Sequence, residues 1–361
     1  MYAARGLLKL VDAVAGAAAL RFMNAEGREK SPLIPKKILV IRPGGIGDFV
    51  LLLPMLKHIN KYLPKTEIDV LCERRNTDAA CFFPFRKVYL YDTNPIKLKK
   101  VFSEMYDAVI NTEQFHSIPS FLAYFTKAPI IVGFDSANRG ETVTRPVHYA
   151  ENVFEAVNFL RLGNALTGKI TKFNADSPFL APDKTAALPQ DFLKSLTTGK
   201  KHIGIFNGAS YPQNAWAGES FSALCERLRR KGWKIVAFGR FSPPEGLELA
   251  CRENLDVLNM GGRLDIRQTT LAISRLDAFV SVNSGLGHIS YGVGTPTIFL
   301  RANVNKIKWT PHIRHCRTLN FHPAGKCSPD CGILCPNGAI YMHRIAPEHV
   351  MRKLAYYIPR S

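Results

Sequence analysis

The sequence has no uncharged apolar run of about 18 residues, the length that a membrane-spanning helix needs, so a spanning helix is not expected. It also lacks RRM, KH and zinc-finger patterns, and no basic stripe interleaved with aromatic residues takes their place, so nucleic acid is not an expected partner. Acidic side chains are scarce, because 29 Asp and Glu residues stand against 48 Lys and Arg residues, giving a formal net charge of +19. Such a surplus favours a polyanionic partner, either an anionic membrane surface or a phosphorylated substrate.

A signal-peptide cleavage pattern is also lacking, and the eight cysteines are spread along the chain. We therefore expect a reducing, cytoplasmic setting with mostly free thiols. Cys327, Cys331 and Cys335 recur every four residues near Cys316 and His322, a spacing that a zinc site would tolerate. The usual set of four ligands in close pairs is incomplete, so no metal is predicted and these three cysteines stay candidates only.

Residues 1–35 differ in pattern from the rest of the chain. Within them, Tyr2–Met23 places apolar residues at helical spacing, interrupted by basic residues and one aspartate. An amphipathic helix with a positive bias suits the interface of an anionic bilayer. A helix docked on the protein's own surface explains the same pattern.

From residue 36 onward, apolar runs alternate with helical patterns, which is typical of parallel sheets with helices on both faces. The expected strands are Ile38–Ile41, Glu67–Cys72, Phe85–Tyr91, Tyr106–Asn111, Ile130–Phe134, His202–Phe206, Lys234–Phe238, Asp256–Asn259, Ala278–Val282 and Pro296–Leu300. Two tandem Rossmann-like domains are predicted, over residues 36–180 and 201–344, facing each other across a cleft. A proline-rich linker would occupy residues 181–200, and a final helix would lie within residues 345–361.

The stretch Lys36–Pro54 reads as a buried strand, a glycine-rich turn and the start of a helix. Its glycines, Gly44, Gly45 and Gly47, would let a ligand approach the backbone closely. The turn approaches the dinucleotide pattern G-x-G-x-x-G but lacks the third glycine, and Glu73 is placed like a ribose-binding acid.

Asp48 follows that turn, at the carboxyl edge where doubly wound sheets bind their ligands. A carboxylate at this position would repel a pyrophosphate, yet it would serve as a general base for a neutral hydroxyl. A plain helix N-cap is the alternative.

Two further turns come after expected strands in the second half. In SVNSGLGHIS, Ser284 and Gly285 would present N–H groups and a hydroxyl to a phosphate, while His288 would support the loop or contact the phosphate. In FNGASYPQNAW, the small residues Ala209 and Ser210 leave room for a ligand beside the backbone.

Four motifs follow one another along the chain: R-x-G-G-x-G-D-x-x-x-x-x-P, G-A-S…W, S-G-x-x-H and G-x-P-T-x-x-L. In this joint order, the sequence resembles the bacterial heptosyltransferases of glycosyltransferase family 9 over roughly residues 37–357. The resemblance implies a GT-B fold, with the donor nucleotide on the C-terminal domain and the acceptor on the N-terminal one. It also implies that the last helix packs back on the first domain.

The same resemblance assigns roles to single residues. Asp48 would be the catalytic base of an inverting, metal-independent transfer, in which helix N-termini stabilise the departing diphosphate. The donor-binding positions are Ala209, Ser210, Asn214, Glu245, Leu264, Asn283, Ser284, Gly285 and His288. The acceptor-binding positions are Gly44, Gly45, Gly47, Glu113 and His116, of which the last two belong to a loop that solvation alone would also explain.

Two positions depart from the family pattern. Asn283 stands where the family has an aspartate that contacts the donor sugar, and Asn214 stands where it has a phosphate-binding lysine. Another basic residue, Lys306, Lys308 or Arg301, would have to replace that lysine. The implied donor is ADP-heptose or another nucleotide-diphosphate sugar.

The predicted function is therefore transfer of a sugar, heptose first, to an acceptor of the lipid A and core-oligosaccharide type. The enzyme would need no cofactor and would work in the cytoplasm, on the anionic inner face of the cytoplasmic membrane. Two alternatives stay open. One is an NAD-dependent oxidoreductase that uses the first glycine turn, and the other is a non-catalytic GT-B relative that binds glycan or membrane.

Overall fold

The computed structural model describes residues 23–25, 27–29, 34–93, 95–136, 142–209, 214–242, 247–248, 256–301, 307–309, 315–320 and 342–358. The chain divides into two compact units, Met1–Phe173 and Asn174–Ser361. Several predictions lie outside the described residues, namely the helix Tyr2–Met23 up to its last residue, Ser210, Glu245, Lys306 and the cysteines Cys327, Cys331 and Cys335.

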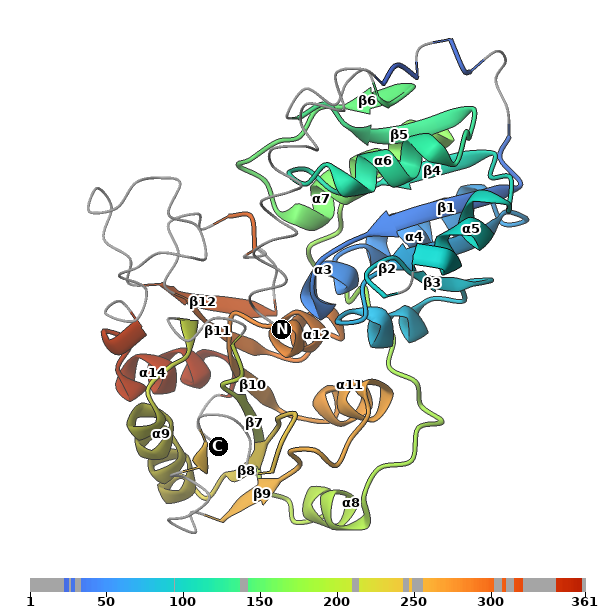
Figure 1. The fold of residues 1–361 in the computed structure, drawn as a ribbon. Coiled ribbons are helices and arrows are strands. Elements are labelled where there is room, and N and C mark those ends of the chain that lie inside the picture. Colours follow the sequence, from blue (N-terminus) through green and yellow to red (C-terminus); the bar gives the residue numbers. More distant parts are fainter. Residues whose placement is uncertain are drawn as a thin grey trace. The chain divides into compact units, whose positions relative to one another are not determined.

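The first unit is built on a six-stranded parallel sheet with the order β3-β2-β1-β4-β5-β6 (Figure 1). Its elements are β1 (Lys37–Arg42), α3 (Ile46–Val50), α4 (Leu53–Tyr62), β2 (Glu67–Cys72), the 3₁₀ helix η2 (Thr77–Phe82), β3 (Val88–Leu90), α5 (Pro95–Phe102), β4 (Ala108–Asn111), α6 (Ile118–Phe125), β5 (Ile130–Phe134), β6 (Arg145–Val147) and α7 (Glu155–Thr167). This is the Rossmann strand order, in which ligands bind beyond the carboxyl ends of the strands where the order reverses. Here that switch point lies between β1 and β4.

The sheet is covered on both faces, as the unbroken apolar run of β1 requires. Leu39 and Ile41 face α5 and α6, where Val101 and Leu122 join the same buried cluster. On the opposite face α4 packs against α7 (Figure 1). A Cβ at Gly163 in α7 would lie 3.0 Å from a side-chain carbon of Met55, so a glycine permits this close helix packing.

The second unit repeats the architecture, with a six-stranded parallel sheet of order β12-β11-β10-β7-β8-β9. Its elements are α8 (Gln190–Leu196), β7 (His202–Phe206), α9 (Gly218–Arg230), β8 (Lys234–Ala237), β9 (Val257–Asn259), α11 (Ile266–Ser274), β10 (Ala278–Val282), α12 (Gly285–Gly292), β11 (Thr297–Arg301), β12 (Cys316–Asn320) and α14 (Pro347–Tyr357). The order again reverses between the first and the fourth strand along the chain, here β7 and β10. The two predicted Rossmann-like domains are confirmed.

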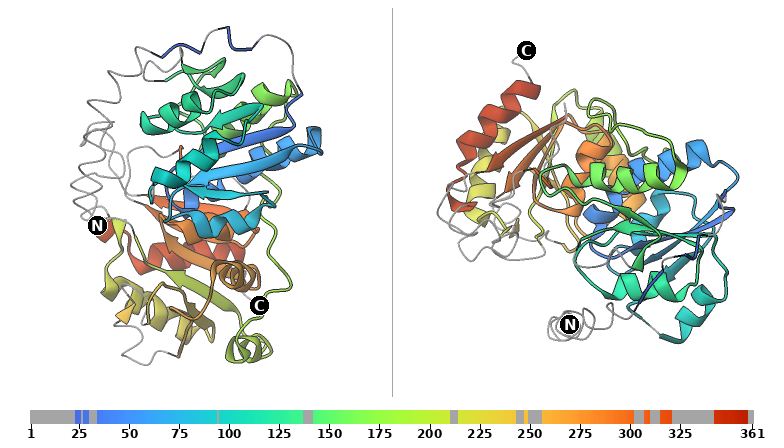
Figure 2. Two further views of the ribbon diagram at one scale, coloured as in Figure 1. Left: turned by 45° about the vertical axis from the view of Figure 1, so that its right-hand side comes forward. Right: turned by 90° about the horizontal axis from the view of Figure 1, so that it is seen from above.

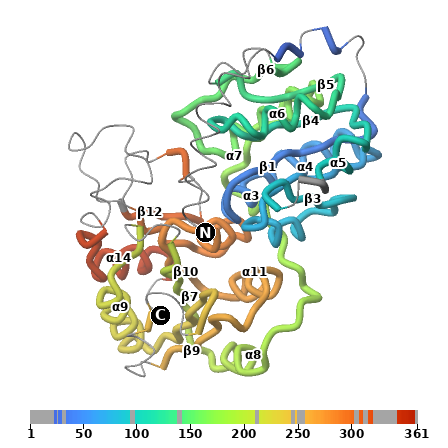
Figure 3. Tube along the Cα trace, in the orientation of Figure 1, coloured from blue at the N-terminus to red at the C-terminus, as the bar shows by residue number. Residues whose placement is uncertain are grey.

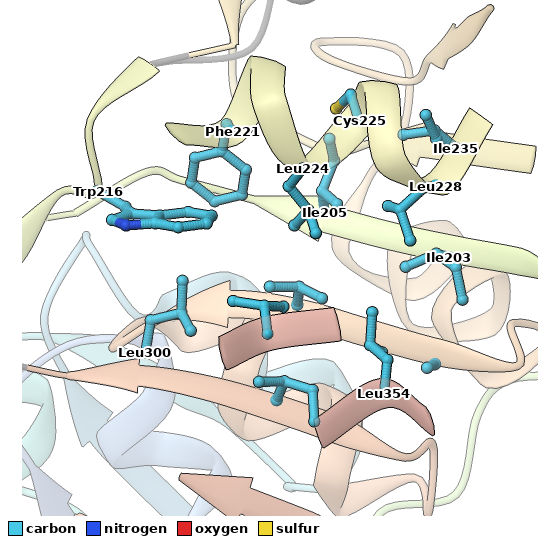
Figure 4. Packing of buried hydrophobic residues seen from close by; sticks show 14 of the residues in the cluster. Ile203, Ile205, Trp216, Phe221, Leu224, Cys225, Leu228, Ile235, Leu300 and Leu354 are labelled. Atoms are coloured by element: carbon cyan, nitrogen blue, oxygen red, sulfur yellow. The ribbon is translucent and has the colours of Figure 1, made fainter. Parts of the chain in front are cut away.

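The core of the second unit lies between one sheet face and the helices α9 and α14. Figure 4 shows Phe221, Leu224 and Leu228 of α9 above Ile203 and Ile205 of β7, and these residues belong to one buried cluster. On the other face, α11 and α12 contact each other and α12 contacts β10 and β11.

The last helix was predicted to pack back on the first domain, but its buried face packs within the second unit. Val350 and Leu354 are buried in the core of the second unit, and α14 lies beside α9 in both views of Figure 2. The indole N–H of Trp216 also donates to the carbonyl of Ile345, 2.8 Å away, just before this helix. The amphipathic face of α14 is therefore covered within its own unit.

The predicted linker is wrong as well. The chain divides at residues 173 and 174, and residues 181–200 contain α8, whose Phe192 is fully buried. Asp191 forms a two-pronged ion pair with Arg263, at 2.7 and 2.9 Å. Residues 181–200 therefore belong to the second unit, to which α8 is attached by the buried Phe192 and by the Asp191–Arg263 pair.

Candidate active site

Asp48 lies in the first turn of α3, directly beyond the carboxyl end of β1, which Figure 3 traces as one path. Its Oδ2 accepts the backbone N–H of Gly45 at 2.7 Å, and its Oδ1 lies 3.2 Å from Arg42 Nη2. The N-cap is Gly45, so the alternative of Asp48 as the N-cap is wrong; Asp48 stands at the third helical position, and its bond to the Gly45 N–H belongs to a capping box. The side chain remains 25% exposed, so the carboxylate is held at two points and still accessible.

The glycines of this turn make room for that carboxylate. Gly44 has a φ of +108°, and a Cβ at this position would lie 2.6 Å from Asp48 Oδ2. Gly47 is buried in α3, whereas Gly44 and Gly45 are half-buried. Gly44 therefore makes room for the Asp48 carboxylate, and Gly47, being buried, is less accessible to an acceptor than Gly44 and Gly45 are.

Arg42, the last residue of β1, also belongs to the site, although the sequence alone assigned it no role. Its side chain is 3% exposed, and Nη1 donates to the carbonyl and the hydroxyl of Thr112, at 3.1 and 3.3 Å. The guanidinium carbon lies 4.7 Å from the ring centroid of Phe159, a cation–π contact. The signal was present in the sequence, because Arg42 is the first letter of R-x-G-G-x-G-D.

Glu113, which follows β4 on the other side of the switch point, is largely used inside its own loop. Its Oε1 accepts the N–H groups of Gln114, Phe115 and His116, at 3.0, 2.7 and 3.2 Å, and lies 3.2 Å from His116 Nδ1. Burial opposes its ionisation, but the hydrogen bond and charge of His116, with the charge of Arg42, lower the pKa of Glu113 to about 2. The structure thus places Glu113 beneath the surface and leaves His116, 44% exposed, as the accessible residue of the pair.

The depressed pKa predicts how stability depends on pH. A carboxyl group that moves from an ordinary pKa of 4.5 to about 2 on folding stabilises the protein above about pH 4.5, and this contribution disappears as the pH falls towards 2. It amounts to something on the order of 3 kcal/mol. Glu113→Gln should therefore be markedly less stable than the wild type at pH 7 and nearly equal to it at pH 2.5, in urea unfolding followed by circular dichroism. The exposed Glu151→Gln is the control, and a Glu113→Gln deficit that is the same at both pH values would contradict the assignment.

Glu73, at the end of β2, does not have the free carboxylate that a nucleotide ribose would need. Its oxygens accept the hydroxyl of Tyr91 at 2.5 Å and the backbone N–H of Gly44 at 3.4 Å, and it pairs with Arg75. The Gly45 N–H, which a pyrophosphate would use, already bonds Asp48. Both observations count against the oxidoreductase alternative.

In the second unit, Ser284 caps α12 immediately beyond β10. Its Oγ accepts the N–H of Gly287 at 3.2 Å and lies 2.8 Å from the hydroxyl of Ser281. The N–H groups of Gly285 and Leu286 precede the first intrahelical bond and are directed out of the helix. This half-buried turn is suited to an anion such as a phosphate.

His288 lies below that turn rather than on its surface. The side chain is buried, its Nδ1 bonds the hydroxyl of Tyr291, and its ring lies 5.5 Å from the ring of Phe299. Burial, together with the charge of Arg301, lowers the pKa of His288 to about 3, so the ring is neutral at physiological pH. Of the two predicted roles, these contacts favour support of the loop over contact with a phosphate.

The loop after β7 reaches the same edge of the sheet. Asn207, which the sequence reasoning did not assign, donates to the Trp216 carbonyl at 2.8 Å and accepts its N–H at 2.9 Å, which ties the two ends of the loop together. Ala209 is half-buried, and Asn214 is 8% exposed. Ala209 and Ser284 therefore flank the switch point between β7 and β10.

Two further predicted donor positions, Leu264 and Asn283, also lie beyond carboxyl ends of strands. Leu264 comes after β9, next to Asp265, which caps α11, and Asn283 directly precedes Ser284. Both side chains are half-buried.

Among the residues that the structure describes, no three His, Cys, Asp or Glu side chains are grouped so as to hold a metal ion. No described helix is long and apolar enough to cross a membrane.

Comparison with known proteins places these observations in context. A family model described as "Glycosyltransferase family 9 (heptosyltransferase)" matches residues 96–340. The lipopolysaccharide core heptosyltransferase OpsX of Haemophilus influenzae is 22% identical over 298 residues, which cover 77% of this chain and 82% of that protein.

Solved structures show the same fold. A member of glycosyl transferase family 9 from Veillonella parvula superposes with a TM-score of 0.71 at 20% identity, over 90% of this chain and 98% of that one. The ADP-heptose lipopolysaccharide heptosyltransferase II of Escherichia coli gives a TM-score of 0.68 at 16% identity, over 89% and 98% of the two chains. The fold is GT-B, as the sequence predicted.

Proposed function

This chain belongs to glycosyltransferase family 9 and is a glycosyltransferase, and from that premise we propose that it transfers a heptose from ADP-heptose to a lipopolysaccharide-core acceptor. The proposal includes inversion at the anomeric carbon, no requirement for a metal ion, and Asp48 as the base. The observation that carries it is the Asp48 carboxylate, fixed by Gly45 and Arg42 and still 25% exposed at the carboxyl edge of its sheet.

The proposed chemistry is a single displacement. The acceptor hydroxyl gives its proton to Asp48 while its oxygen forms a bond to the anomeric carbon of the donor. The bond between that carbon and the diphosphate oxygen breaks, and the electron pair leaves with the diphosphate. Attack opposite the leaving group inverts the configuration. The reaction requires the edges that carry Asp48 and Ser284 to face each other, which stays a prediction.

The developing negative charge on the diphosphate needs donors that are already oriented. The N–H groups of Gly285 and Leu286 at the start of α12 supply them in this proposal, and Ser284 holds the turn through its bond to Gly287. A Cβ at Gly287 would lie 2.2 Å from the ring of Phe299, so the turn depends on this glycine.

Asn214 stands where the family has a phosphate-binding lysine, and of the described basic residues we propose Lys308 as its replacement. Its Nζ lies 5.2 Å from the ring centroid of Trp309, and that ring lies 6.4 Å from the ring of His288 in the first turn of α12. Both described candidates are buried, and Lys308, 8% exposed, is the more accessible of the two, because Arg301 is 1% exposed. We therefore assign the diphosphate cation to Lys308.

Lys308→Met should raise the KM for ADP-heptose about tenfold, because a charge-assisted hydrogen bond to the diphosphate is lost. Steady-state kinetics at saturating acceptor measure this change. Lys194→Met on the exposed side of α8 is the control and should leave that KM unchanged. An unchanged KM in Lys308→Met would show that another group supplies the charge.

The proposed function is tested by incubating the purified protein with ADP-heptose and a deacylated lipopolysaccharide core in the presence of EDTA. We expect formation of the heptosylated core with stoichiometric release of ADP, at a rate that EDTA does not change. A rate that EDTA abolishes and a divalent cation restores would contradict metal independence. ADP-heptose binding without transfer or hydrolysis would indicate the non-catalytic relative, and NAD binding without ADP binding would indicate the oxidoreductase.

The remaining part of the proposal concerns location. A net charge of +19 suits an acceptor that is phosphorylated and held at an anionic membrane surface. We propose that the enzyme works at the cytoplasmic face of that membrane. Sedimentation with vesicles containing an anionic phospholipid, compared with neutral vesicles, measures this association.

A further inference from the structure

We propose that Arg42 is the positioning residue of the transfer reaction, holding the Asp48 carboxylate in the orientation from which it accepts the proton of the acceptor hydroxyl. This inference rests on the proposed function, because it concerns the same site. The similarity to heptosyltransferases assigns no role to this arginine, and its contacts in the structure carry the proposal.

Arg42 is fixed independently of Asp48. Nη1 donates to the carbonyl of Thr112 at 3.1 Å, and the Thr112 hydroxyl donates in turn to the carbonyl of Ile41 at 2.7 Å. The Phe159 ring of α7 lies 4.7 Å from the guanidinium carbon. Three elements, β1, the end of β4 and α7, therefore set the position of a guanidinium that is almost entirely buried.

Asp48 depends on that guanidinium for one of the two contacts that hold its carboxylate. Oδ2 accepts a hydrogen bond from the N–H of Gly45 at 2.7 Å, and Oδ1 forms an ion pair with Arg42, 3.2 Å from Nη2. A carboxylate held at one oxygen alone can rotate about its last bond, whereas two partners fix its plane. Because a misplacement of about 1 Å can cost about 100-fold in rate, the second contact matters for catalysis.

Other charged groups near this site do not hold the carboxylate in the same way. Arg75 is 45% exposed and pairs with Glu73, and the charge of Asp48 is only one of the smaller influences that raise the pKa of Arg75. Glu113 comes after β4, and its carboxylate bonds its own loop. The only ion pair to Asp48 within the described residues is the one from Arg42.

The experiment is a double-mutant cycle on the full chain, using kcat and KM for transfer from ADP-heptose to the deacylated core. Arg42→Met should lower kcat about 100-fold and change either KM by less than roughly threefold, because a transition-state interaction is lost and ground-state binding is not. The kcat of Arg42→Lys should be about tenfold higher than that of Arg42→Met. The double variant Arg42→Met/Asp48→Asn should be no slower than Asp48→Asn alone, because Arg42 acts through Asp48.

Arg145→Met is the control for loss of an arginine that is half-buried, 26% exposed, and also bonds backbone carbonyls. Arg145 pairs with Glu29 and donates to the carbonyls of Ala165 and Leu166, at 3.1 and 3.0 Å. Its kcat should stay within twofold of the wild type, and thermal unfolding reports on any variant that fails to fold.

Each result has one interpretation. If the kcat of the double variant falls by the product of the two factors measured for the single variants, Arg42 acts independently of Asp48 and the inference is overturned. A raised KM with an unchanged kcat in Arg42→Met would make Arg42 a substrate-binding residue and would also overturn the inference. Full activity in Asp48→Asn would overturn the proposed base, and that single variant separates failure of the proposed function from failure of the inference.

Discussion

Asp48→Asn is expected to lower kcat for heptose transfer by about 1,000-fold while leaving the affinity for ADP unchanged. Asparagine has the size of aspartate, and its carbonyl oxygen can still accept the N–H of Gly45 that now bonds Asp48 Oδ2 at 2.7 Å. It cannot take up the proton of the acceptor hydroxyl. The change therefore removes the base and preserves the turn, and the measurement is kcat at saturating donor and acceptor with ADP titration calorimetry beside it.

Asp135→Asn is the matched control for this variant. Asp135 follows β5 at the same carboxyl edge of the sheet, and its Oδ1 accepts the N–H of Tyr149 at 3.4 Å. We expect Asp135→Asn to keep at least half of the wild-type kcat. Activity of Asp48→Asn within a few fold of the wild type, with the fold intact, would sink the assignment of the base.

Gly44→Ala should lower kcat about 100-fold, because the new methyl group displaces the base. At this position a Cβ would lie 2.6 Å from Asp48 Oδ2 and 2.9 Å from the carboxylate carbon, so Asp48 must leave its two partners. The φ of +108° adds a backbone strain of about 1–3 kcal/mol, since residues with a side chain rarely adopt it. Kinetics and thermal unfolding of the same preparation separate the two effects.

Gly168→Ala separates strain from displacement. Gly168 also has a positive φ, +68°, at the C-cap of α7, but a Cβ there would meet nothing within 4 Å. We expect this control to lose stability and keep its kcat. Equal losses of activity in the two variants would mean that strain, and not the position of Asp48, explains the result at Gly44.

Most of the fold could be predicted because its strands are buried on both faces and read as continuous apolar runs. Glu67–Cys72, Ile130–Phe134 and Ala278–Val282 were predicted with the bounds that the structure has. β6 was missed because it spans three residues and contains Pro146, and β12 was missed although it pairs with β11 along five residues. Both are edge strands, with only one neighbour to bury them.

Packing between elements was harder to predict than the elements themselves. An amphipathic helix such as α14 shows in its sequence that one face is covered, but not by which unit. The sequence likewise showed the prolines of residues 181–200, while the burial of Phe192 depends on the fold of the second unit.

In the site, the residues on glycine turns could be predicted and their partners could not. Asp48 and Ser284 stand next to glycines after strands, a local signal that the structure confirms as turns at carboxyl edges. Arg42 depends on Thr112, which lies 70 residues away in the chain, and no local pattern reveals that contact. Glu113 was recognised as a carboxylate at the edge, but its bonds to its own loop decide what it does.

The most direct test of the single displacement that Asp48 is proposed to assist is the anomeric configuration of the product. Wild-type protein is supplied with ADP-heptose and the deacylated core, and the new linkage is analysed by the one-bond coupling between C1 and H1 of the transferred heptose. A single displacement assisted by Asp48 predicts a configuration opposite to that of the donor. Retention of the donor configuration would contradict Asp48 as the base of a direct transfer.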